Sequence, residues 1–302
     1  MLTKENIAEK FKILQDNICQ AIENTDGKGK FIEDLWEHHG GGGGRTRLIQ
    51  KGNVLEKGGV NFSAVQGETS EALMKQLKLT EKADYFATGV SIVMHPNSPM
   101  VPIIHMNVRY FEMSNGIWWF GGGIDLTPHY VVEDDARWFH QQLKEVCDRS
   151  NPEYYSKFKT WADNYFFIPH RNETRGIGGI FFDYLKNDPN QAGTTKEELF
   201  NFTYAVGNTF VPTYTHLMQK NKDLPFGETE KKWQMLRRGR YVEFNLVWDR
   251  GTKFGLETNG RTESILMSLP PIAHWEYDFR PETDSNEAKT LGLLQKGINW
   301  ID

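Results

Sequence analysis

The sequence predicts an α+β protein with a broad, largely antiparallel β-sheet flanked by α-helices on both faces. Strand-like segments follow one another closely at residues 86–95, 100–113 and 117–126. The connections between them are too short for the crossover that parallel strands need, so neighbouring strands must be antiparallel. Helical patterns precede and follow this run, and strands in runs with helices between the runs are typical of the α+β class.

The composition is that of an ordinary globular chain. It has 302 residues, 38% of them hydrophobic, and a net charge of −5, so no global basic field favours nucleic acid. No apolar run approaches the roughly 20 residues of a membrane-spanning helix. The N-terminus has no signal-peptide core, and two cysteines are too few for a disulfide framework, which suits a reducing cytoplasm. We expect one domain over residues 1–302, with no membrane span and no nucleic-acid partner.

The elements follow in chain order. Ile7, Phe11, Leu14 and Ile18 fall at helical spacing and predict an amphipathic first helix. The glycine run 40–44 lacks the Lys-Ser/Thr of a phosphate-binding loop, so it predicts a flexible loop or tight packing, as does the glycine-rich segment after Arg175. Beyond the strand run we expect helices at 132–149, 153–165, 196–220 and 228–238, and further strands at 240–248 and 252–257.

A row of polar residues lies on the predicted strand "IIHMNVRYF". Successive side chains of a strand point to opposite faces, so His105, Asn107 and Arg109 share one face. If His95 pairs with Val101 across a five-residue loop, Ser91 lies opposite His105 and both join that face. This clustering predicts a functional site on the sheet.

The position of Asp125 depends on the second hairpin. A two-residue Asn115-Gly116 turn would put Asp125 on the opposite face from Arg109. A three-residue loop with Gly116 in the left-handed conformation would set His105 across from Asp125 and Arg109 across from Gly121. A bulge in the glycine run 121–123 would also correct the register. The pattern alone does not choose, and we favour the version that gathers the polar groups.

The residue types on this face suit carboxylate recognition. The planar fork of Arg109 matches a carboxylate, and such charged hydrogen bonds contribute roughly 1.5–3 kcal/mol each. Asp125 would act as a base or accept hydrogen bonds from N–H groups, and His105 would move protons near neutral pH. The histidines also raise the alternative of a metal site built from His95, His105, His140 and His170. No tightly spaced histidine motif supports it, and His140 lies on the apolar stripe of its helix.

The segment "KTWADNYFFIPHRNETRGIGGIFFD", residues 159–183, resembles the signature of the oxygen-dependent coproporphyrinogen III oxidase family. Ala162 stands where that signature has a cysteine, so no catalytic thiol is expected there. The stretches "GVSIVMHPNSPMVPIIHMNVRYF", "WWFGGGIDLTPHY" and "GRYVEFNLVWDRGTKFGLETNGRTESILMSLPP" are also similar to family blocks, and the resemblance covers nearly the whole chain.

The resemblance implies that the protein is a homodimer and that it catalyses the reaction of this family. The family removes two propionate carboxyls of coproporphyrinogen III oxidatively and forms protoporphyrinogen IX in haem biosynthesis. Dioxygen is the oxidant, and carbon dioxide and hydrogen peroxide leave. No organic cofactor is implied, and the resemblance leaves open whether a divalent metal is used. The rival interpretations are a histidine-ligated metal-dependent oxygenase and a non-catalytic tetrapyrrole-binding protein.

The resemblance also assigns roles to residues of this chain. His105 matches a proposed proton donor, and Asp125 matches a carboxylate that faces the pyrrole N–H groups. Our hypothesis adds that Arg109 takes part in the reaction by anchoring a propionate. Substrate-contacting positions match Ser91, Asn107, Val108, Arg109, Asn259, Gly260 and Arg261. The divalent-metal ligands proposed for bacterial members match His95, His105, His140 and His170.

Overall fold

The computed structural model describes residues 2–187, 194–257 and 260–301, and an antiparallel sheet forms its centre. The seven strands lie in the order β1-β2-β3-β4-β5-β6-β9, so only β9 is not the sequence neighbour of the strand it pairs with. A separate short pair, β7 (Phe167–Ile168) and β8 (Glu173–Thr174), precedes β9. The strands of the large sheet are β1 (Phe31–Glu37), β2 (Gly42–Gln50), β3 (Leu55–Glu68), β4 (Asp84–Pro96), β5 (Ile103–Met113), β6 (Trp118–Thr127) and β9 (Gly179–Leu185).

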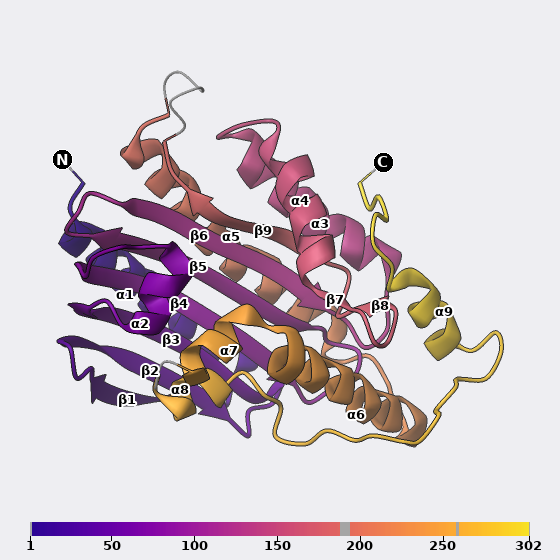
Figure 1. Ribbon diagram of the computed structural model, residues 1–302. Helices are drawn as coiled ribbons and strands as arrows, with labels where there is room; N and C mark the ends of the chain where they lie inside the picture. Colours follow the sequence, from indigo (N-terminus) through magenta and orange to yellow (C-terminus); the bar gives the residue numbers. More distant parts are fainter. Residues whose placement is uncertain (1, 188–193, 258–259, 302) are drawn as a thin grey trace.

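Helices cover both faces of this sheet, as the sequence predicts (Figure 1). On one face α1 (Lys4–Asp26) and α5 (Lys196–Asn221) pack against each other and against the central strands, with α3 (Glu133–Asp148) beside α5. The helix α4 (Tyr154–Tyr165) packs on β9. The other face carries α2 (Glu71–Leu77), α7 (Arg250–Glu257) and α8 (Thr262–Leu266). The helix α6 (Glu228–Glu243), the π-helix η1 (Phe244–Trp248) and α9 (Asn286–Leu293) complete the described elements.

The main core lies between the sheet and the two helices α1 and α5 that cover one of its faces. The stripe predicted for the first helix is buried there, with Ile7, Phe11 and Ile18 fully inaccessible to water. Burying an aliphatic or aromatic side chain of this size contributes about 1.5–3 kcal/mol. Thr3 caps the start of α1 through a capping box, and Gly27 ends it in the left-handed conformation at φ 77°.

Most of the predicted helices are confirmed, but the strands expected at 240–248 and 252–257 are wrong. Instead, α6 continues to Glu243, η1 follows, and Arg250–Glu257 forms α7. Buried Trp233, Arg237 and Tyr241 recur every four residues along α6, so one buried helical stripe runs into the segment that was expected as a strand, and it outweighs the strand propensity there. The Asp249 carboxylate then begins α7 by accepting the Thr252 N–H at 2.7 Å.

Residues 31–68 form three strands that the sequence analysis did not identify, and the glycine run contributes to one of them. A Cβ on Gly44 would lie 2.1 Å from the Trp36 ring, so this glycine allows close packing of β1 on β2. A Cβ on Gly179 would lie 2.0 Å from the Ile124 carbonyl oxygen in the β6–β9 pair. Tight packing is therefore the confirmed alternative for both glycine-rich segments.

Two features bear on the compartment and membrane expectations. Cys19 and Cys147 are both buried with free thiols. No helix in the described ranges has the length and apolarity needed to cross a bilayer.

Buried histidines make the stability of the fold depend on pH. Burial lowers the pKa of His95 and of His140 to about 3 from the usual 6.5. Below pH 6.5 these imidazoles are therefore protonated in the unfolded chain but stay neutral in the folded chain. The stability of the fold decreases as the pH is lowered from about 6.5 to about 3. We expect the free energy of unfolding to drop by about 1 kcal/mol per pH unit for each imidazole near pH 5.

Urea unfolding between pH 4.5 and 7.5 measures this slope. His140→Gln should reduce it by about one imidazole's share, while the same change at exposed His39 should leave it unaltered. An unchanged slope in His140→Gln would show that His140 is not the source.

Candidate functional site

The registers of β4, β5 and β6 decide which polar residues share a face. His105 pairs with Asp125 and Arg109 with Gly121, and Gly116 has φ 87° in the connecting loop. The predicted three-residue loop is thus confirmed, and it brings Asp125 to the face of Arg109. The predicted register of the first hairpin is wrong by two residues, because Ser91 pairs with Asn107 rather than His105. A shift of two leaves every side chain on its face, so the predicted polar face survives.

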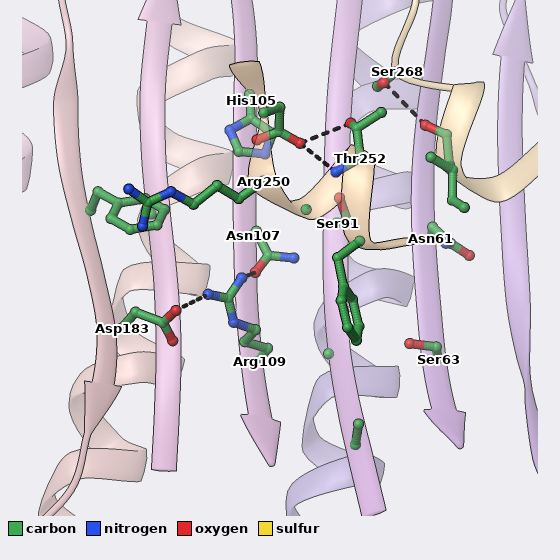
Figure 2. Close-up of a pocket in the computed structure, with 18 of the residues that line it drawn as sticks. Asn61, Ser63, Ser91, His105, Asn107, Arg109, Asp183, Arg250, Thr252 and Ser268 are labelled. Carbon is green, nitrogen blue, oxygen red and sulfur yellow. Dashed lines mark hydrogen bonds and ion pairs between the residues drawn. The ribbon is translucent and has the colours of Figure 1, made fainter. Parts of the chain in front are cut away.

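These pairings lay three short rows of side chains across the sheet. The rows are Val93–His105–Asp125, Ser91–Asn107–Gly123 and Gly89–Arg109–Gly121. A cavity of about 610 Å³ lies over them, and residues of α2, α7 and α8 also line it. Figure 2 shows the polar side chains of β3, β4 and β5 pointing into this space from its floor. A volume of this size suits a drug-sized organic ligand.

Asp125 forms the most buried charged contact of the site. Its carboxylate is 1% exposed and accepts the Nδ1–H of His105 at 2.8 Å on one oxygen. The other oxygen accepts a bond from Arg175 at 2.6 Å. Because an ionised carboxylate only accepts, the imidazole carries its proton on Nδ1 and keeps Nε2 for other partners. His105 lines the cavity, and Asp125 lies beneath it.

The ionisation of Asp125 follows from these contacts. Burial acts to raise the pKa of Asp125, but the charge of Arg175 and the hydrogen bond from His105 outweigh burial. The pKa therefore lies below its usual range, and the carboxylate is charged at neutral pH.

Arg175 is a functional candidate that the sequence analysis missed. Its side chain is 3% exposed, and its guanidinium also donates to Asn245 at 2.8 Å. Three aromatic rings surround its charge, with centroids 4.4–4.8 Å from Cζ, namely those of Phe166, Tyr241 and Phe244. This aromatic cage stabilises the cation away from water. The Asp125 and His105 side chains are therefore held from below by a rigid buried group.

Arg109 lies one row away on the same floor. Its Nη2 pairs with the Asp183 carboxylate at 2.8 Å, and its Nη1 donates to the Asn107 side chain at 3.2 Å. These contacts place a guanidinium at the cavity surface beside an amide. Arg250 on α7 adds a third guanidinium to the lining, beside Arg109 and the buried Arg175, and no ion pair to it is found within the described residues. Asp183 and Arg250 were also missed from sequence.

Other predicted substrate contacts lie away from the cavity. The Val108 side chain is fully buried on the opposite face, against α5, since a Cβ on Gly207 would lie 3.6 Å from it. Arg261 pairs with Asp34 at 2.5 Å, and neither Arg261 nor Gly260 lines the cavity. Asn259 lies outside the described residues. Of the predicted set, the structure gathers Ser91, His105, Asn107 and Arg109 at the cavity, with Asp125 beneath them.

The four predicted metal-ligating histidines are not brought together. His95 donates to the Ser268 carbonyl at 2.8 Å, and His140 is held by Tyr155 and the Ile177 carbonyl. His170 bonds to Glu243 and Trp248 outside the cavity. Within the described ranges no group of three or more His, Cys, Asp or Glu side chains could hold a metal ion. The residues present do not fit the metal site that the resemblance implies, because each imidazole has a separate environment.

Comparisons with known proteins agree on one family. The model of the family described as coproporphyrinogen III oxidase matches residues 6–300. A protein of Parasynechococcus marenigrum (strain WH8102) named oxygen-dependent coproporphyrinogen-III oxidase is 48% identical over 95% of this chain and 85% of its own length. A protein of the same name from Prochlorococcus marinus (strain NATL2A) is 48% identical over 95% of this chain and 88% of its own.

Proposed function

The chain belongs to the coproporphyrinogen III oxidase family, and we propose that it is an oxygen-dependent coproporphyrinogen III oxidase. It converts two propionate side chains of coproporphyrinogen III to vinyl groups and yields protoporphyrinogen IX. For each group, the propionic acid and one dioxygen give a vinyl group, one carbon dioxide and one hydrogen peroxide. Two electrons pass from the substrate to dioxygen, and no organic cofactor takes part.

The observation that carries this proposal is the arrangement on the cavity floor. One cavity presents an oriented imidazole, His105, and a guanidinium, Arg109, on the same face of one strand. A tetrapyrrole of the porphyrinogen class offers pyrrole N–H groups at its centre and propionates at its rim. An Nε2 lone pair suits a pyrrole N–H, and a guanidinium suits a propionate.

His105 is the proposed catalytic residue, and Asp125 acts through it. With Nδ1–H bound to the charged Asp125 carboxylate, the ring is held in the tautomer whose Nε2 lone pair is free to take a proton. His105 would accept a proton from the substrate as the β-hydrogen or pyrrole hydrogen leaves. Asp125 and Arg175 fix the ring and its tautomer from below.

Arg109 holds the substrate in place through a propionate, helped by Asn107 and Ser91 on the same face. Arg250 is the second propionate candidate, since Figure 2 shows its side chain extending from α7 into the same space. Fixing two rim carboxylates would set which substituent lies beside His105. The resemblance further leads us to propose that the protein is cytoplasmic and forms a homodimer. Sedimentation of the purified protein would test the homodimer.

A turnover assay under air and under argon tests the activity. We expect purified protein to convert coproporphyrinogen III to protoporphyrinogen IX under air, with two carbon dioxide molecules per product, and to stop when dioxygen is removed. Binding of porphyrin without dioxygen consumption would instead identify a tetrapyrrole-binding protein. Complete loss of turnover after chelation, restored by one divalent metal, would identify a metal-dependent oxygenase.

A further inference from the structure

The cation proposed to hold a substrate propionate is already paired with a carboxylate of the protein. Asp183 Oδ2 lies 2.8 Å from Arg109 Nη2 on the cavity floor. Figure 2 shows Asp183, Arg109 and Asn107 joined in one line by these contacts. A ligand carboxylate that approaches Arg109 therefore meets a competing carboxylate of the same chemistry.

Local backbone structure holds Asp183 at this position. The β6–β9 register shifts between Phe120 and Gly122, so Asp183 and Tyr184 together face Gly121. Tyr184 takes the left-handed conformation at φ 50°, which is rare for a residue with a side chain. Its N–H donates to Asp183 Oδ1 at 2.9 Å, and its ring lies 4.9 Å from that of Trp119. One carboxylate oxygen is thus bound to the bulge, which leaves the other for Arg109.

The absence of a side chain at Gly121 leaves room for the Arg109–Asp183 pair. A Cβ on Gly121 would lie 2.7 Å from Arg109 Nε and 2.7 Å from Asp183 Oδ1. Any side chain at this position would push the two charged groups apart. A bulge, a left-handed tyrosine and a bare glycine therefore coincide at one ion pair. Backbone conformations of this kind persist where the surrounding structure maintains them, often at functional sites.

We propose that Asp183 is a specificity-determining competitor for Arg109, displaced by the substrate's propionate on binding and restored to Arg109 on release. This inference rests on the proposed function. Before binding, Asp183 neutralises Arg109, so ligands without a carboxylate gain nothing from opening the pair. A propionate replaces one charged partner by another, and Asp183 turns towards water. On release Asp183 takes the place of the departing carboxylate, so Arg109 does not lose its ion pair.

The exposure of the pair makes this exchange feasible. The Arg109 and Asp183 side chains are 38% and 21% exposed, far more than Arg175 and Asp125 at 3% and 1%. Ion pairs that water reaches are weak, whereas opening a buried pair leaves an uncompensated charge. The two ion pairs therefore have different roles. The buried Arg175–Asp125 pair stays intact when substrate binds, whereas the more exposed Arg109–Asp183 pair separates.

Asp183→Asn tests the proposal, with oxidised coproporphyrin III as the probe. This porphyrin carries the four propionates but is already oxidised, so its binding can be titrated by fluorescence without turnover. An asparagine keeps an oxygen for the Tyr184 N–H but removes the competing charge. We expect the Kd of the full-length variant to fall by at least fivefold, with a steeper dependence on salt. Asp183→Glu should bind like the wild type, because it keeps the charge.

Two further variants make the result specific. Asp134→Asn removes the acid of another Asp–Arg pair, on α3 and outside the cavity, and should leave the Kd unchanged. In an Arg109→Ala background the gain from Asp183→Asn should shrink to the small effect of removing one negative charge near the ligand, since the competition needs Arg109.

An equal or higher Kd in a folded Asp183→Asn would overturn the proposal and make Asp183 a plain support for Arg109. If the wild type turns over coproporphyrinogen III while Asp183→Asn gains no affinity, only this inference fails. If the wild type neither binds the porphyrin nor turns over the porphyrinogen, the proposed function fails with it.

Discussion

Asp125→Asn should lower kcat/KM for coproporphyrinogen III by about 10²- to 10⁴-fold. The amide has nearly the shape of the carboxylate but lacks its charge, so it no longer stabilises a protonated His105 across the 2.8 Å hydrogen bond. The NH₂ group would also favour the other imidazole tautomer, with the proton on Nε2 at the cavity. The loss should appear mainly in kcat, measured as product formed under air at saturating substrate.

The same substitution should cost stability, and the two effects need separating. Removing one charge of the buried pair leaves Arg175 without its counterion, which is expected to cost about 3 kcal/mol. Asp163→Asn is a matched control, because Asp163 is buried and paired with Lys159 at 2.6 Å but does not line the cavity. We expect it to lose stability while its folded fraction keeps kcat. A folded Asp125→Asn with near-normal kcat/KM would contradict the role given to Asp125.

The polar face was predictable because it depends on local rules. Alternation along a strand placed His105, Asn107 and Arg109 together. The face of Asp125 was left open by the pattern, since two turns fitted it, and the left-handed Gly116 of the structure selects the turn that brings Asp125 round. The pairing of Ser91 was not predictable in the same way. A slip of two residues keeps every side chain on its face, so hydrophobic alternation cannot detect it.

The missed residues depend on contacts far along the chain. Arg175 follows β8, and only the fold brings it beneath Asp125. Asp183 had a weak local signal, since alternation along "GIFFD" places it on the face of Phe181, but nothing local showed that β9 pairs with β6. The strands predicted at 240–248 and 252–257 were wrong because aromatic and β-branched residues suit any buried surface, and here that surface is helical.

Arg109→Ala should lower kcat/KM by about 10²- to 10³-fold, mostly through a higher KM. Two charge-assisted hydrogen bonds to a propionate contribute roughly 1.5–3 kcal/mol each, and the partly exposed setting reduces that sum to about 3–4 kcal/mol. The substitution also frees Asp183, whose unpaired charge would then repel the substrate's carboxylates. Arg109→Lys should recover only part of the loss, since an ammonium keeps the charge but not the planar fork.

Arg137→Ala is the control variant for the loss of affinity expected in Arg109→Ala. Arg137 is an ion-paired arginine on α3 that does not line the cavity, so its removal should leave KM and kcat close to wild type. Pairing Arg109→Ala with Asp183→Asn should restore a small part of the affinity that Arg109→Ala alone loses, because the repelling carboxylate is gone. If Arg109→Ala instead kept its KM and lost only kcat, the guanidinium would act on the reacting atoms and not as the anchor of a propionate.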